Sequence, residues 1–130
     1  MAHDRATTRT AASKVRFLGA AKTGTQDAWR VRVTSVALAF LTIAFVWIVL
    51  SLVGKDYASA RAFLARPPVA ILLLMFILSG VQHMKIGMQA IIDDYVHAPH
   101  LKDASLLANL FFSFAIGLAC VYAVLKLSFA

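Results

Sequence analysis

The segment Gly80–His100 has the sequence GVQHMKIGMQAIIDDYVHAPH and decides how the chain folds. It begins within an apolar run and ends in a short polar corner that carries two carboxylates and a tyrosine. His83 lies inside the apolar run, and an imidazole at membrane depth needs a partner that lipid cannot supply. A polar group at depth and a polar cluster at the rim together suggest a cofactor within the membrane and a ligand site at its edge.

The composition is that of an integral membrane protein. Of the 130 residues, 61% are hydrophobic and the mean hydropathy is +0.78, whereas a soluble domain contains roughly 45–50% apolar residues. The net charge of +7 comes mostly from Lys and Arg ahead of the first apolar run. Such a cluster is typical of a topology signal and of contact with anionic head groups, so nucleic-acid binding is disfavoured. The single cysteine, Cys120, lies in an apolar run, which excludes a disulfide framework and favours a packing role.

Three runs are long and apolar enough to cross a bilayer, which needs about 20 residues of helix. The predicted spans are residues 33–53, 69–92 and 104–125, and Lys85 is the one charged residue within them. The sequence therefore predicts an all-α integral membrane fold with three transmembrane helices. A basic N-terminal arm, residues 1–30, would precede the three-helix anchor domain, residues 31–130.

The ends of the spans carry the expected signals. Within the arm, Thr25 is predicted to cap a helix that runs through Trp29, which would lie at head-group level. The first connector is predicted to contain an amphipathic turn over residues 58–64, and proline opens the second span. The second connector is predicted at residues 93–103, where Pro99 breaks the helix.

Lys and Arg are more frequent in the N-terminal arm and second connector than in the first connector and C-terminus. The positive-inside rule then places the N-terminus and the second connector in the cytoplasm or matrix, and the C-terminus on the opposite side. The membrane is predicted to be a bacterial inner (plasma) membrane or the mitochondrial inner membrane.

Small residues share a face of the second span with His83. At about 100° per residue, one side of the helix carries Gly80, His83, Gly87, Ala90 and Asp94. This pattern predicts a groove for a flat macrocycle or for a closely packed helix. His83 is accordingly interpreted as an axial haem ligand, with a hydrogen bond to a neighbouring helix as the alternative.

No other histidine is placed to face His83 within one bundle. His3 lies in the arm, and His97 and His100 lie in the predicted second connector. A six-coordinate haem would therefore take its second axial ligand from another polypeptide. The sequence thus predicts an obligate partner with its own membrane histidine, and a heteromeric haem-binding bundle of which this chain forms part.

Tyr95 follows His83 by 12 residues, which is about 18 Å along an ideal helix and brings it to the interface. A phenol there can donate a hydrogen bond to a quinone carbonyl, and the carboxylate of Asp94 can orient the phenol or relay protons. The alternative for Tyr95 is an interfacial aromatic anchor. The alternative for Asp93, Asp94 and Asp103 is solvated loop charge.

Lys85 is interpreted as a side chain that snorkels towards the interface. Its alternative role is to neutralise a carboxylate or a propionate.

Residues 83–97, HMKIGMQAIIDDYVH, resemble the H-x3-G-M-…-D-Y-V motif of the D-type hydrophobic membrane anchor subunits of succinate dehydrogenase, respiratory complex II. Residues 18–38, LGAAKTGTQDAWRVRVTSVAL, resemble the stretch that leads into the first helix of that family. With three spans and the predicted orientation, the likeness covers nearly the whole chain after the first dozen residues.

The resemblance implies specific roles. His83 would be the axial ligand of haem b, shared with a cytochrome b subunit, and Tyr95 would hydrogen-bond ubiquinone with Asp94 beside it. Arg32 matches the arginine near the haem propionates. Relatives often carry a histidine near the position of Gln26 and Asp27. This chain has no histidine there, so no role is carried over to those positions.

The resemblance therefore implies a subunit without catalytic residues of its own. It would anchor the flavoprotein and iron–sulfur subunits of succinate:ubiquinone oxidoreductase to the membrane, while cofactors carry the electrons. Two alternatives remain open from the residues. One is a cofactor-free small transporter or assembly subunit, and the other is the anchor of a quinol:fumarate reductase.

Overall fold

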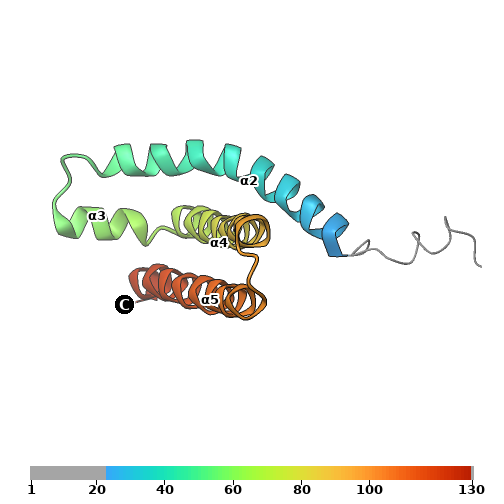
Figure 1. The fold of residues 1–130 in the computed structure, drawn as a ribbon. Coiled ribbons are helices and arrows are strands. Elements are labelled where there is room, and N and C mark those ends of the chain that lie inside the picture. Colours follow the sequence, from blue (N-terminus) through green and yellow to red (C-terminus); the bar gives the residue numbers. More distant parts are fainter. Residues whose placement is uncertain (1–22, 130) are drawn as a thin grey trace, which may run out of the picture.

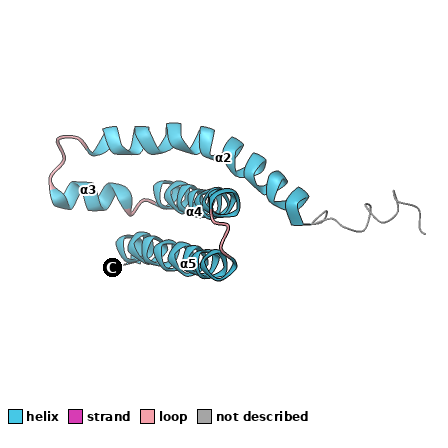
Figure 2. Cartoon of the chain, in the orientation of Figure 1, coloured by secondary structure: helices cyan, strands magenta, loops and turns pink. Residues whose placement is uncertain are grey.

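The computed structural model describes residues 23–129, and this part of the chain is built of helices joined by short loops (Figures 1 and 2). The predicted arm lies outside the described residues as far as residue 22. The helices are α2 (Thr23–Leu52), α3 (Tyr57–Leu64), α4 (Pro67–Tyr95) and α5 (Pro99–Phe129).

Helix α4 is the central element. Helices α2 and α5 both pack against it and do not pack along one another, so α4 lies between them (Figure 1). The three long helices consequently form an open row, and the short α3 lies between the end of α2 and the start of α4. Such a row buries little surface. In each candidate span, more than four-fifths of the most apolar segment is not buried inside the chain.

Helices α2, α4 and α5 are long and apolar enough to cross a membrane, as the sequence predicts. They contain 30, 29 and 31 residues, which is more than the roughly 20 residues that hydrocarbon requires. Helix α2 begins at Thr23, so the predicted helix through Trp29 is continuous with the first span. The side chain of Trp29 is 65% exposed within this chain.

The turn between α2 and α3 is formed by a glycine with a positive φ and by a side chain that caps the start of α3. Gly54 has φ 75°, a conformation that favours glycine, and it turns the chain immediately after α2. Asp56 then caps α3 by accepting a hydrogen bond from the Ser59 backbone N–H, at 3.5 Å. The predicted amphipathic turn is thus a two-turn helix.

Hydrogen bonding by Ser59 lowers the pKa of Asp56 below its ordinary value. The capping contribution is therefore fully present above the pKa of the unfolded chain, and it is lost as the pH falls through the lower folded-state pKa.

Phe63 packs α3 against the long helices α2 and α4. Its side chain is buried with Ile48 of α2 and Val69 of α4, and the Trp47 ring meets it edge-on at 6.0 Å between centroids. The Arg66 guanidinium lies 5.5 Å from the Phe63 ring centroid, a cation–π distance. This cluster closes the end of the molecule opposite Tyr95.

The predicted second connector is too long, because α4 continues to Tyr95 and α5 already begins at Pro99. Only residues 96–98 form the loop. Pro99 does end the preceding helix, but its missing N–H and fixed φ also suit the first position of the next one. Asp93, Asp94 and Asp103 are therefore helical residues near the α4–α5 loop, and they are not loop charges.

Close packing at Gly117 brings α5 against α4. A Cβ placed on Gly117 would lie 3.3 Å from Cγ1 of Val81, which is tighter than ordinary van der Waals contact. We expect Gly117→Val to push the two helices apart and to destabilise the fold by about 1–3 kcal/mol. Thermal aggregation of the detergent-purified protein measures this effect, with Ala119→Val on the exposed side of α5 as the matched control. Equal midpoints for the two variants would contradict the expectation.

Candidate functional site

His83 lies on the side of α4 that faces α2 and is half-buried within the chain. One turn earlier, a Cβ placed on Gly80 would make ordinary contact with Leu38, at 3.9 Å. One turn later, a Cβ on Gly87 would meet nothing within 4 Å. The open space predicted beside His83 is thus found at Gly87, while the Gly80 side is occupied by α2.

Nδ1 of His83 is hydrogen-bonded to the hydroxyl of Thr34 on α2, at 3.1 Å. The same hydroxyl lies 2.8 Å from the Arg30 carbonyl and 3.1 Å from the Val31 carbonyl of its own helix. The alternative predicted for His83, a bond to a neighbouring helix, is therefore realised at one ring nitrogen. Nε2 has no hydrogen-bond partner among residues 23–129.

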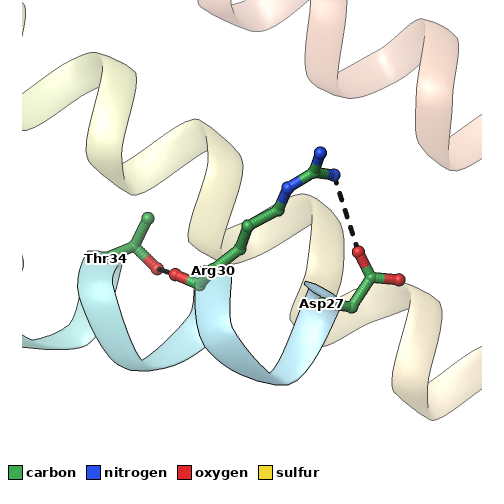
Figure 3. Close-up of polar contacts among 3 residues, drawn as sticks. All are labelled: Asp27, Arg30 and Thr34. Carbon is green, nitrogen blue, oxygen red and sulfur yellow. Dashed lines mark hydrogen bonds and ion pairs between the residues drawn. The ribbon is translucent and has the colours of Figure 1, made fainter. Parts of the chain in front are cut away.

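A basic groove of about 430 Å³ opens beside Thr34, between α2 and α4. Arg30 reaches this groove while also lying 3.6 Å from the Asp27 carboxylate, an exposed pairing on the first turns of α2 (Figure 3). The groove is lined by Trp29, Arg30, Val33, Thr34, Gln82, Lys85 and Ile86. Its two cations give it the charge to attract a carboxylate or phosphate.

Arg32 is not part of this groove. It is exposed on α2, two residues from Thr34, and a two-residue step turns a helix by about 200°. Among the described residues, the cations that line this groove are Arg30 and Lys85, and His83 is not part of its lining. The structure does not bring Arg32 into the groove.

Tyr95 and Asp94, the residues predicted to form a quinone site, lie at the end of α4. Tyr95 is the last residue of the helix, and its side chain is 78% exposed. Asp94 is exposed beside it and has no partner among the described residues, whereas Asp93 pairs with Lys102 of α5 at 2.8 Å. The ion pair joins the two ends of the short loop, and Asp94, which directly precedes Tyr95 in the sequence, has no part in it.

Two uncharged polar residues of α5 contribute contacts that were not predicted from the sequence. Asn109 donates from Nδ2 to the Lys85 carbonyl of α4 at 2.9 Å, and Ser113 donates to Oδ1 of Asn109 at 3.3 Å. Ser113 is only 2% exposed. Their i, i+4 spacing within an apolar run was the available signal, since such groups serve as polar contacts between membrane helices.

Within the part of the chain that is described, no three His, Cys, Asp or Glu side chains gather as ligands for a metal ion. His83 therefore belongs to no such cluster among the described residues. His97 and His100 are exposed near the α4–α5 loop, well along the helix axis from His83, as the sequence predicts.

Comparison with known proteins decides the family. Residues 6–122 match the family described as succinate dehydrogenase/fumarate reductase transmembrane subunit. The chain belongs to this family. It is 33% identical over 110 residues to the succinate dehydrogenase hydrophobic membrane anchor subunit of Paracoccus denitrificans, a match that covers 85% of this chain and 84% of the relative. The protein of the same name from Rickettsia bellii (strain RML369-C) is 27% identical over 111 residues, a match that covers 85% of this chain and 89% of the relative. No solved structure matches the chain significantly.

The resemblance to succinate dehydrogenase anchor subunits and the all-α membrane fold are thereby confirmed. The protein is a multi-pass membrane anchor subunit with three candidate spans. A cofactor-free transporter finds no support among these relatives, whereas a fumarate reductase anchor falls within the family's description.

Proposed function

We propose that this anchor subunit binds haem b through His83 and contributes Tyr95 and Asp94 to a ubiquinone site. The haem assignment rests on the burial and the hydrogen bonding of the His83 imidazole. It is half-buried in a membrane helix, its Nδ1 is engaged by Thr34, and its Nε2 has no partner among the described residues. A single neutral imidazole nitrogen is what an axial haem position requires from a protein.

The surroundings of His83 suit a large flat group. Gly87 leaves open space one turn after His83, and a separate groove beside Thr34, the partner of His83, carries the positive charge of Arg30 and Lys85. Such charge would suit the carboxylates of a bound haem. The role of Arg32 as a partner of the haem propionates rests on the family resemblance alone. Bound haem would supply one-electron redox chemistry, and this chain would hold and orient it. The second axial ligand would come from a cytochrome b subunit.

The quinone assignment rests on Tyr95 and Asp94 together. Both are exposed at the end of a membrane helix, where a head group at the interface can reach them. The Tyr95 hydroxyl can donate to a quinone carbonyl, and Asp94 can deliver protons from the aqueous side.

The subunit itself carries out no chemistry on succinate in this proposal. Succinate is oxidised on the flavoprotein, and electrons pass through the iron–sulfur subunit to ubiquinone. The N-terminus and the α4–α5 loop would face the cytoplasm or matrix, so that Tyr95 would lie on the side where those soluble subunits would dock.

Purification of the tagged full chain from its native membrane tests the assembly. We expect mass spectrometry to find a flavoprotein, an iron–sulfur protein and a second membrane subunit in about equal amounts with the tagged chain. An identically tagged, unrelated three-span protein provides the control. Recovery of the tagged chain without flavoprotein and iron–sulfur protein would rule out the proposed function.

A further inference from the structure

The hydroxyl of Thr34 has one proton and three polar neighbours. It lies 2.8 Å from the Arg30 carbonyl, 3.1 Å from the Val31 carbonyl and 3.1 Å from Nδ1 of His83. Both carbonyls are acceptors only, so any bond with them uses the Thr34 proton. The shortest contact, to Arg30, has the length typical of an O–H···O bond, and it is the usual bond of a helical threonine to the preceding turn.

This count fixes the direction of the bond to His83. Because the Thr34 proton is directed to its own helix, the hydroxyl oxygen faces Nδ1 with its lone pairs. Nδ1 must then carry the hydrogen and donate it, and 3.1 Å is within the range of an N–H···O bond. In a neutral imidazole, a hydrogen on Nδ1 leaves the lone pair on Nε2.

We infer that Thr34 is a positioning residue that selects the Nδ1–H tautomer of His83 and orients its Nε2 as a ligand. This inference deepens the proposed haem site and rests on it. A ligating histidine commonly donates its other N–H to an acceptor, which fixes the ring and raises the basicity of the ligand. Here the acceptor comes from the neighbouring helix, so the packing of α2 on α4 sets the direction of the imidazole.

The variant that tests this is Thr34→Val, which keeps the branched shape and removes the acceptor. In the purified complex we expect haem retention to weaken by about tenfold. We also expect the haem midpoint potential to rise, because a less electron-rich imidazole stabilises ferric iron less. Thr34→Ser, which keeps the hydroxyl, should restore both values. Thr42→Val, the same substitution at an exposed position of α2, is the matched control and should match the unmodified complex.

A measurement on the unmodified chain makes the test independent of folding of the variants. With ¹⁵N-labelled histidine in this subunit, and with the assembled complex in lipid bilayers prepared without haem, nitrogen NMR reports the tautomer of His83 directly. The His83 signal is assigned by its loss in His83→Gln. We expect the Nδ1–H form, and an Nε2–H form would overturn the inference.

The results distinguish a failure of the haem assignment from a failure of the role given to Thr34. If His83→Ala leaves the haem spectrum intact, the haem assignment itself fails. If His83→Ala removes the spectrum while Thr34→Val equals Thr42→Val in potential and retention, only the role of Thr34 fails. Loss of haem retention in Thr34→Val, with recovery in Thr34→Ser, supports both.

Discussion

Replacing His83 by alanine is expected to abolish the low-spin haem spectrum of the purified complex. The substitution removes the proposed axial ligand, and the other two described histidines, His97 and His100, lie beyond the end of α4. Loss of positioning residues around a metal typically weakens binding by roughly 10- to 100-fold, so loss of the ligand itself should exceed that range. The optical spectrum and the haem content per complex measure the effect.

His97→Ala is the control for that experiment. His97 is exposed in the loop after α4, and its Nδ1 is hydrogen-bonded to the Tyr95 carbonyl at 3.2 Å. Its removal should leave the haem spectrum unchanged. A normal spectrum in the His83 variant would show that the iron is held elsewhere, and the hydrogen bond to Thr34 would then be a simple contact between helices.

Tyr95→Phe is expected to slow ubiquinone reduction by roughly 10- to 100-fold. Succinate oxidation with an artificial acceptor should stay near its normal rate. The phenol is 78% exposed and has no partner within the described chain, so its loss removes a donor to quinone without disturbing the fold. The ratio of the two rates is the relevant measurement.

The matched substitution is Tyr57→Phe. Tyr57 is 80% exposed at the start of α3, at the opposite end of the molecule from Tyr95. It serves equally well as an interfacial aromatic, so the pair distinguishes an anchoring role from a quinone contact. If both variants reduce quinone at the normal rate, Tyr95 is an anchor and the proposed quinone contact is wrong.

The membrane fold was predictable because hydrocarbon imposes a single requirement, a long uninterrupted apolar helix. The three runs satisfy it, and each coincides with one of the three long helices, the first run ending one residue beyond α2. The helix ends were less predictable. A proline can both end one helix and begin the next, and Pro99 does so with only residues 96–98 between the two. The polar corner at Asp93 therefore belongs to the helices.

The site was predictable only in part, for a different reason. His83 stands out in the sequence because a histidine in an apolar span demands an explanation. Its partner Thr34 does not stand out, because which residues of α2 meet α4 depends on the packing register of two helices. Asn109 was missed likewise, since its acceptor is a backbone carbonyl, which no sequence pattern marks.

The open row of helices has a consequence for handling the protein. Among the described helices, α2 and α5 pack mainly on α4, and only the short α3 adds contacts to α2 and α5 at one end. Little else therefore holds the chain together if one of these two seams opens. Detergent can enter both seams from either flank. Produced without its partners, the subunit should therefore be short-lived in cells and prone to aggregate after extraction. Co-production with the other subunits should raise the yield of extractable protein more than any change of detergent.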